Sequence, residues 1–384
     1  MNRRAMSARP SRRQTLAGLG ALAASGLADE PARGAAPAAR LGRGVNLSHW
    51  FAQSQQGYGP GHLAGFVTPD DLRRIAGAGF GHVRLSLEPS AIFAEADPRG
   101  RTALAEPVLA ALREALGRIR AEGLAVVLDL HPVGPDKDRL STPAGADALV
   151  SGWAALAGAF RVESGPAFVL EILNEPDPLK GETWWALQER ALAAIRAAGA
   201  RGPVIANGGS WSGVEDLVAR APYADPAVIY TIHCYAPLLF THQGATWTWD
   251  VAAGIAGVGW PIPPEAADGA AAAATADARA RGFLRDQIAG SAFTREALDA
   301  ALAPLTAWQE RHGGPPVYVG EFGVYAAVAP TEARLSWIRA AREAFERRGW
   351  SWALWDNTPE FGFRQATSRA LDPAMLGALG VGAS

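Results

Sequence analysis

Two glutamates stand where apolar runs of the sequence end. Glu175 follows the run at 168–174, and Glu321 lies near the end of the run at 317–322. An acid that protonates a leaving oxygen and a carboxylate that attacks an anomeric carbon are the two groups that glycoside hydrolysis requires. A separation of about 5–5.5 Å between such groups gives net retention. The pair therefore predicts a retaining glycoside hydrolase, provided that both runs end at one place in the fold.

Further polar or aromatic side chains mark other apolar runs. A single buried polar residue is often just hydrogen-bonded in place, but several that converge describe a site. Besides the two glutamates, the runs carry Arg84, His131, Asn174, His233, Tyr235 and Trp355.

The elements that must position these residues alternate along the chain. Short β-branched runs are followed by Ala/Leu/Arg segments with helical spacing, which is typical of βαβ units and a parallel sheet. Eight such units favour an α/β fold of the (β/α)₈ TIM barrel class, in which the active site lies at the carboxyl ends of the strands. An open doubly wound sheet is the alternative, but no Gly-rich phosphate loop follows the first run. The strands are expected at 44–50, 82–87, 125–131, 168–174, 204–207, 228–235, 317–322 and 350–356.

Helix signals lie between the strands. Thr68 can cap a helix that Pro69 opens, with acidic residues in its first turn. Further helices are expected at 106–120, 184–198 and 333–348.

The loop after the sixth strand is enlarged. Residues 236–316 far exceed an ordinary loop of about 2–6 residues between a strand and a helix. The pattern predicts a helix at 294–311 and an irregular surface excursion at 267–276. We expect the tryptophan-bearing part to form a wall of the substrate cleft, with Trp247, Trp249 and Trp260.

Taken in order, these motifs resemble glycoside hydrolase family 5, the cellulase family whose catalytic glutamates lie on strands four and seven. The resemblance covers roughly residues 42–360. The Asn-Glu pair alone is a weak signal, but the ordered set is strong. The matching positions are Arg84, His131, Asn174, Glu175, His233, Tyr235, Glu321 and Trp355.

The resemblance implies a role for each position. Glu175 is expected to be the general acid/base, with a raised pKa, and Glu321 the ionised nucleophile. Arg84 and Tyr235 should hydrogen-bond Glu321 and favour its anion. Asn174 should bind the 2-hydroxyl of the sugar next to the scissile bond, and Trp355 should form the floor beneath it. His131 and His233 should bind sugar hydroxyls or orient Glu175.

Three more residues are weaker candidates for contact with substrate. Trp211 is equally consistent with a sugar platform and with packing, because flat indole faces suit both. His49 and Trp50 end the first strand and are expected to line the cleft. Asp129 and Asp177 are expected to be structural.

The amino terminus has the anatomy of a signal peptide. Residues 1–28 combine paired arginines with a short apolar run, which is typical of the twin-arginine type. Residues 29–41 are predicted to be a flexible linker, and residues 42–384 the catalytic domain. The run is too short to span a bilayer, so we expect export to the bacterial periplasm or exterior with no membrane anchoring after cleavage. A single cysteine, Cys234, excludes an intrachain disulfide.

Composition limits the partners. The net charge is −2, with no basic patch that would favour nucleic acid. A neutral polysaccharide or oligosaccharide substrate fits this balance. The proposed chemistry needs no metal and no organic cofactor, and we expect a monomer.

Alternatives remain open from the sequence. A metal-dependent amidohydrolase would want a His-x-His motif after strand one, where His49 stands alone. A non-catalytic polysaccharide-binding barrel should have lost one carboxylate. An endo-acting β-1,4-glucanase is favoured, with β-mannan, xyloglucan, β-1,3- or β-1,2-glucan and exo action as alternatives. The absence of a binding module hints at soluble or short substrates.

Overall fold

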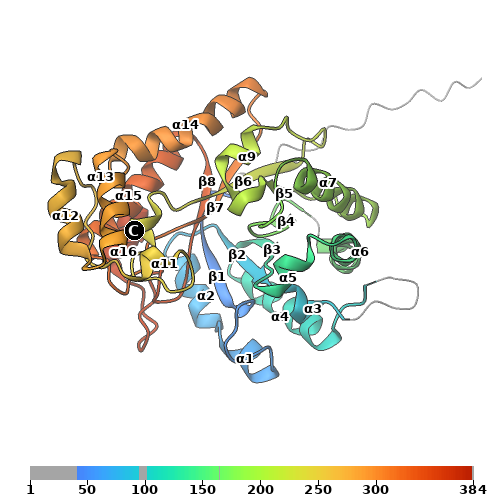
Figure 1. The fold of residues 1–384 in the computed structure, drawn as a ribbon. Coiled ribbons are helices and arrows are strands. Elements are labelled where there is room, and N and C mark those ends of the chain that lie inside the picture. Colours follow the sequence, from blue (N-terminus) through green and yellow to red (C-terminus); the bar gives the residue numbers. More distant parts are fainter. Residues whose placement is uncertain (1–40, 95–101, 164, 383–384) are drawn as a thin grey trace, which may run out of the picture. The chain divides into compact units, whose positions relative to one another are not determined.

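The structure is a computed structural model, and it describes residues 41–94, 102–163 and 165–382. Within these residues, eight parallel strands close into a barrel in sequence order, and helices surround it (Figure 1). The predicted (β/α)₈ barrel is therefore confirmed and the open sheet is wrong. The strands are β1 (Arg43–Phe51), β2 (His82–Leu87), β3 (Ala125–Leu130), β4 (Phe168–Glu171), β5 (Val204–Asn207), β6 (Val228–Cys234), β7 (Val317–Phe322) and β8 (Ser351–Leu354).

The helices lie where caps and periodicity place them. Thr68 caps α2 in a capping box with Asp71, as its position before Pro69 predicts. The helices of the first half are α1 (Pro60–Gly65), α2 (Pro69–Gly77), α3 (Pro89–Ile92), α4 (Glu106–Ala121), α5 (Pro135–Arg139), α6 (Pro143–Ala159), α7 (Gly181–Ala197), α8 (Gly209–Ser212) and α9 (Val214–Val218). Those of the second half are α10 (Leu238–Thr241), α11 (Asp250–Ala253), α12 (Ala267–Ala274), α13 (Ala278–Ala289), α14 (Arg295–Arg311), α15 (Thr331–Arg347) and α16 (Pro373–Leu379), with 3₁₀ turns at Arg161–Glu163 and Pro264–Ala266.

The inside of the barrel is built in layers. Val127, Val169 and Ile205 belong to one cluster of fully buried apolar side chains. Asp129 and Glu171 follow two of these valines by two residues, so alternation along a strand directs them to the same inner face, nearer the carboxyl ends. A charged layer therefore lies above an apolar layer, at the end of the barrel where active sites form.

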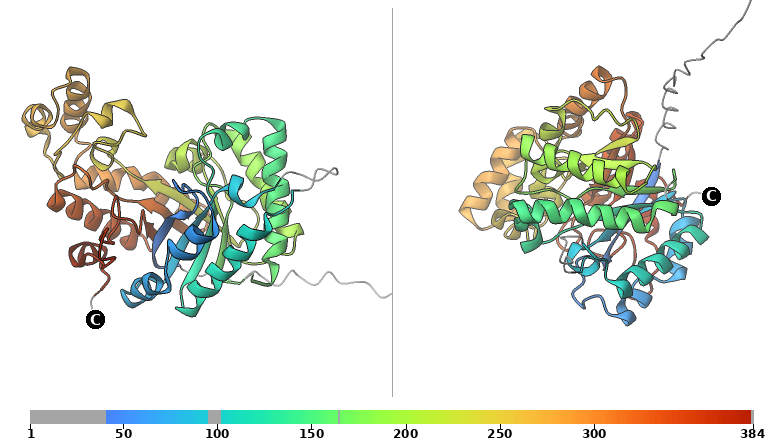
Figure 2. Two further views of the ribbon diagram at one scale, coloured as in Figure 1. Left: turned by 90° about the horizontal axis from the view of Figure 1, so that it is seen from below. Right: turned by 90° about the vertical axis from the view of Figure 1, so that its right-hand side faces the viewer.

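The insertion after β6 differs from expectation in one segment. Residues 267–276 are largely helical rather than irregular, because α12 buries Ala267 and Ala271 and packs against α13. Alanine has the highest intrinsic helix propensity, so an Ala-rich stretch with one buried face forms a helix readily. Figures 1 and 2 show α12 and α13 to one side of the barrel strands.

The tryptophans of the insertion have different environments. Trp260 is 4% exposed and belongs to the core. Trp249 packs on that core and against Phe283, with ring centroids 5.0 Å apart. Trp247 is 56% exposed. The prediction of a tryptophan wall is therefore wrong for Trp260, which is buried, whereas Trp249 is half-buried and Trp247 is the most exposed of the three.

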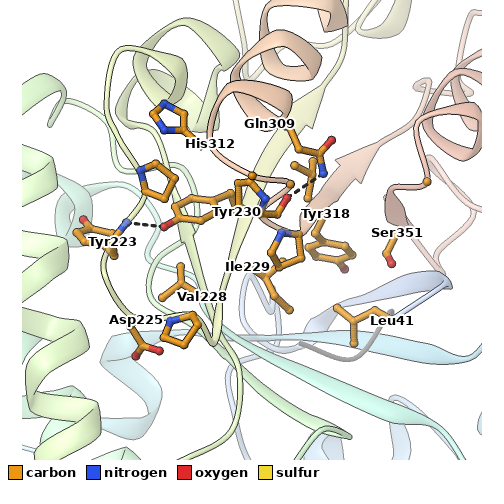
Figure 3. Close-up of a pocket in the computed structure, with 18 of the residues that line it drawn as sticks. Leu41, Tyr223, Asp225, Val228, Ile229, Tyr230, Gln309, His312, Tyr318 and Ser351 are labelled. Carbon is orange, nitrogen blue, oxygen red and sulfur yellow. Dashed lines mark hydrogen bonds between the residues drawn. The ribbon is translucent and has the colours of Figure 1, made fainter. Parts of the chain in front are cut away.

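A cavity of about 670 Å³ lies at the opposite end of the barrel (Figure 3). It is lined by the first residues of β6 to β8 and by the end of α14, including Tyr230, Tyr318 and Gln309. Neither of the two candidate glutamates lines it. Residues at this end of a barrel serve stability, so we assign the cavity no chemistry.

The first strand of the barrel begins at Arg43. Leu41 is buried, and its carbonyl oxygen lies 3.0 Å from Nδ1 of His82. The predicted signal peptide and the rest of the predicted linker lie outside the described residues. In the part of the chain that the structure describes, none of the helices combines the length and apolar character that crossing a membrane requires.

Candidate active site

The two predicted glutamates meet at the carboxyl end of the barrel. Glu321 lies in β7, and Glu175 lies four residues beyond the end of β4. Nδ1 of His233, in β6, is 2.9 Å from Oε1 of Glu175 and 3.5 Å from Oε2 of Glu321. One ligand atom from each of the three side chains lies within 4.8 Å of the other two. The predicted convergence of strands four and seven is therefore present in the fold.

Both carboxylate oxygens of Glu321 accept a hydrogen bond. Nη1 of Arg84 donates to Oε1 at 2.8 Å, and the hydroxyl of Tyr235 donates to Oε2 at 2.9 Å. Burial and the neighbouring carboxylates raise the pKa of Tyr235 well above its ordinary value, so the phenol keeps its proton and remains a donor. Both donors favour the charged form of the Glu321 carboxylate.

Arg84 is held in turn by a residue that the sequence analysis missed. Glu171 of β4 accepts from Nε and Nη2 of Arg84 at 2.7 and 2.9 Å, the two-pronged geometry typical of strong arginine–carboxylate pairs. Asp129 lies 3.0 Å from the same guanidinium. All three side chains are fully buried. A charged residue inside an otherwise apolar strand was the signal for Glu171, because a buried charge needs a partner.

The charges around Arg84 shift each other's protonation. Burial alone would lower the pKa of Arg84, but Asp129, Glu171 and Glu321 raise it, so the guanidinium stays charged. Burial raises the pKa of Asp129 to about 6 and also raises the pKa of Glu171, against the opposing effect of Arg84. The guanidinium of Arg84 thus pairs with three carboxyl groups. Asp129 has a structural role in this cluster, as expected.

Asn174, His131 and Trp355 form a connected edge of the site. Oδ1 of Asn174 accepts from Nη2 of Arg84 at 3.0 Å, and its Nδ2 lies 3.2 Å from Nε2 of His131. Burial lowers the pKa of His131 to about 3, so the ring is neutral, with Nδ1 placed to donate to Asp129 at 2.7 Å. The ring stacks on Trp355 at 5.6 Å between centroids and 15° between planes.

Glu175 does not have the raised pKa that an acid was expected to show. Burial raises the pKa of its carboxyl, but the hydrogen bond and charge of His233, followed by Lys137, lower it below its ordinary value. For His233, burial lowers the pKa, while Glu321 and Glu175 raise it further, so the net direction is upward. Both shifts are in the direction that an ion pair between the Glu175 carboxylate and the His233 imidazole produces.

Lys137 is a second residue that the sequence analysis missed. It lies in α5, after β3, with Nζ 3.6 Å from Oε2 of Glu175. The same ammonium lies 4.5 Å from the ring centroid of Trp211, whose side chain is 56% exposed. A lysine in a polar loop carries no sequence signal for such a position. Trp211 and Glu175 therefore both contact the ammonium of Lys137.

The two candidates at the end of β1 have different positions. Trp50 is fully buried, and its indole nitrogen donates to the carbonyl oxygen of Leu63 at 2.8 Å. The expectation that Trp50 lines the cleft is wrong, because its ring packs outward beneath α1 and against Arg118 of α4. His49 remains partly exposed, with Nδ1 3.1 Å from the carbonyl oxygen of Gln53.

The three central groups are also close enough to ligate one cation, since two carboxylates and an imidazole are common metal ligands. However, the Glu321 oxygens are already bound by Arg84 and Tyr235, and Glu175 by His233 and Lys137. Each carboxylate thus has protein donors and a nearby cation. This arrangement can hold one proton beside one ionised carboxylate without a metal.

Known proteins are similar to this chain over most of its length. The family model Cellulase (glycosyl hydrolase family 5) matches residues 43–361. Cellodextrinase A of Ruminococcus flavefaciens is 26% identical over 80% of this chain and 82% of its own length. Endoglucanase C of Acetivibrio thermocellus is 27% identical over 82% of this chain and 90% of its own.

Solved structures have the same architecture. Cel5A of Thermotoga maritima, determined in complex with cellobiose and with mannotriose, superposes with a TM-score of 0.71 at 25% identity, over 88% of this chain and 97% of that one. The cellulose synthase subunit Z of Clostridioides difficile, at 20% identity and a TM-score of 0.71, shares the fold. The chain therefore belongs to glycosyl hydrolase family 5, the cellulase family, and is a glycoside hydrolase.

Proposed function

We propose that the protein is a retaining endo-β-1,4-glucanase that acts through a covalent glycosyl-enzyme intermediate. The observation that carries the proposal is the meeting of Glu175 and Glu321 within 4.8 Å, ligand atom to ligand atom, at the carboxyl end of the barrel. This spacing supports retention, because inverting enzymes hold their carboxyl groups about 6.5–9.5 Å apart to admit a water between them.

Glu321 is the proposed nucleophile. Its carboxylate is fixed by hydrogen bonds from Arg84 and Tyr235. In the first step, one of its oxygens bonds to the anomeric carbon as the bond from that carbon to the leaving oxygen breaks. A preorganised carboxylate needs no reorientation at that moment, which is the main electrostatic advantage of such a site.

Glu175 is the proposed acid and base. It donates a proton to the leaving oxygen, with the Glu175–His233 pair as the source of that proton. In the second step, the Glu175 carboxylate takes a proton from water, which attacks the anomeric carbon and releases Glu321. A hydrogen-bonded partner of raised pKa lets the pair be reprotonated near neutral pH.

The sugar at the cleavage point is proposed to rest on Trp355. The Nδ2 group of Asn174 has two hydrogens, and only one points at His131, so the second is available to the 2-hydroxyl of that sugar. A contact of this kind strengthens in the transition state. The stacking of His131 on Trp355 fixes the floor in place.

The preference for β-1,4-glucan is supported by the relatives. Relatives are named cellodextrinase and endoglucanase, and one solved structure of the same fold is named an endo-β-1,4-glucanase. β-Mannan is the second candidate, because Cel5A of Thermotoga maritima was determined with mannotriose as well as cellobiose. We propose a soluble or short substrate, and export to the periplasm or exterior by the predicted signal. Comparable rates on crystalline and soluble glucan would contradict the soluble preference.

A reducing-sugar assay over soluble β-1,4-, β-1,3- and β-1,2-glucans, xyloglucan and mannan, with products sized, tests the substrate. Proton NMR of the first product tests the stereochemistry, and we expect the β anomer to appear first. A first product in the α configuration would contradict the retaining mechanism. Glu321→Ala under the same conditions is the control for contaminating activity.

Dialysis against EDTA is a further control, because the proposed chemistry should keep its activity when metal ions are removed.

A further inference from the structure

The ammonium of Lys137 is a cation in the active site whose hydrogen-bond donors are unused. The side chain is only 14% exposed, and a lysine ammonium has three N–H donors. Among the residues that the structure describes, Glu175 is the one carboxylate that pairs with it, and the distance of 3.6 Å is too long for a hydrogen bond. The contact with the ring of Trp211 also leaves these donors free, because the ring attracts the charge as a whole.

Lys137 lies beside the oxygen of Glu175 that is free to react. Oε1 of Glu175 lies 2.9 Å from Nδ1 of His233, whereas Oε2, the oxygen next to Lys137, has no hydrogen bond from any described residue. Oε2 is therefore available to protonate the leaving oxygen. An acid lies within about 2.6–3.2 Å of the atom that it protonates, so that oxygen comes to within about 7 Å of Nζ of Lys137. The leaving oxygen belongs to the sugar that departs, so Lys137 is close to that sugar.

Protonation of Glu175 removes the counter-charge of Lys137. While Glu175 is ionised, its carboxylate balances the ammonium. Once Glu175 carries the proton that it will donate, this balance is lost. Asp136, in the same helix, does not replace it, because Asp136 pairs with Arg139 at 3.2 Å. A largely buried charge without a partner is unfavourable, and an anionic group on the substrate would supply the partner.

We infer that Lys137 selects a glucan that carries a carboxylate on the sugar at the leaving side of the scissile bond. The inference rests on the proposed function and narrows its substrate class. A carboxylate would accept hydrogen bonds from the ammonium and balance its charge while Glu175 is protonated, whereas a neutral hydroxyl supplies only the hydrogen bond. The net charge of −2 gives the chain no general attraction for an acidic polymer, so the preference is local to Lys137.

The test compares two soluble derivatives of the same β-1,4-glucan, anionic carboxymethyl cellulose and neutral hydroxyethyl cellulose. The measured quantity is the ratio of kcat/KM on the first to kcat/KM on the second. We expect this ratio to fall about fivefold in Lys137→Met, because a hydrogen bond to a charged group is lost on the anionic polymer alone. Any change in the protonation of Glu175 affects both substrates and cancels in the ratio.

Arg139→Met is the matched control. Arg139 lies in the same helix, is 75% exposed, and carries the same charge, so its removal tests general attraction of the polymer and should leave the ratio constant. Lys137→Arg keeps the cation and should retain most of the ratio. An unchanged ratio in Lys137→Met, with wild-type thermal stability, would overturn the inference, as would an equal fall in Arg139→Met.

A partly C6-oxidised β-1,4-glucan, measured in the same way, identifies the source of the carboxylate. A preference that depends on Lys137 and extends to this polymer assigns a uronic acid, and one confined to carboxymethyl cellulose assigns a carboxylate on a longer substituent; either result supports the inference. If the wild-type protein hydrolyses none of the polymers, the proposed function has failed. Affinity electrophoresis then decides the role of Lys137 separately. Retention in carboxymethyl cellulose that is weaker for Lys137→Met than for Arg139→Met supports the role, and equal retention overturns it.

Discussion

The two carboxylates of the active site are held in different ways. Glu321 is part of β7, is 6% exposed, and has both oxygens bound by Arg84 and Tyr235. Glu175 lies beyond β4 with a left-handed φ of 41°, is 18% exposed, and contacts His233 and Lys137. Glu321 is thus fixed within a strand, whereas Glu175 lies beyond its strand and its protonation is set by His233 of β6 and Lys137 of α5. A nucleophile gains from rigidity, whereas an acid/base must change its proton occupancy twice in each turnover.

The largest effect is predicted for Glu321, the carboxylate held within a strand. Removing the Glu321 carboxylate in Glu321→Ala should lower kcat by about 10⁴-fold or more, because no other group is positioned to attack the anomeric carbon. Hydrolysis of soluble glucan, with purified variant and wild type at matched concentrations, measures this. Residual activity above about one per cent would show that the strand-held carboxylate is not the nucleophile.

For Glu175, which lies beyond its strand, the predicted effect depends on the leaving group of the substrate. Glu175→Ala should lower kcat/KM on oligosaccharides by about 10²–10⁴-fold, the usual contribution of general acid catalysis. A dinitrophenyl glycoside needs no protonation to leave, so its glycosylation step should be affected far less. Equal losses on both substrates would show that Glu175 is not the acid.

The stability of the protein should depend on Arg84, because this residue is the cation that pairs with the buried carboxylates. Arg84→Met leaves Glu171, Asp129 and Glu321 buried without their counter-charge, which typically costs about 3–5 kcal/mol of the free energy of unfolding. The pKa values of Asp129 and Glu171 are already raised by burial, so the deficit should grow as pH rises through them and shrink in acid.

Urea unfolding at several pH values measures this dependence. Arg73→Met is the control, because Arg73 and Asp70 form an exposed pair whose loss should cost at most about 1 kcal/mol. A stability of Arg84→Met within that range would mean that the charged layer does not hold the barrel together.

The smallest expected effect belongs to Lys137. Catalysis needs one proton in the Glu175–His233 pair, so activity should fall as pH rises past the raised pKa of His233. Removing the ammonium in Lys137→Met lets the pair keep its proton to higher pH, and the alkaline limb of kcat/KM should move up by about one pH unit. Arg139→Met, in the same helix and paired with Asp136, should leave the limb in place. A limb that stays in place or moves down in Lys137→Met would contradict the assigned charge effect.

The strands and most of the site could be predicted because their signals are local. Apolar runs between helical segments define a barrel, and residues at the ends of the runs share one face. The predicted residues lie together for this reason, namely Glu175, Glu321, Arg84, Asn174, His131, His233, Tyr235 and Trp355.

What could not be predicted depends on contacts between distant segments. The side chain of Trp50 packs against α1 and α4. The residues at the end of β1 do not predict this orientation. The position of Lys137 depends on a loop conformation, and the pKa of Glu175 depends on that lysine and on His233. The helix α12 was misjudged because composition alone does not tell a buried Ala-rich face from a surface excursion.

Trapping the intermediate tests the central claim most directly. A 2-deoxy-2-fluoro glycoside with a good leaving group should glycosylate the nucleophile as that group leaves, and the glycosyl-enzyme should then hydrolyse slowly, because the fluorine disfavours the charge that develops at the anomeric carbon. Peptide mass spectrometry of the trapped protein should place the sugar on Glu321, in a peptide that loses the label in Glu321→Ala. A label on Glu175, or turnover with no label at all, would contradict the assignment of Glu321 as the nucleophile.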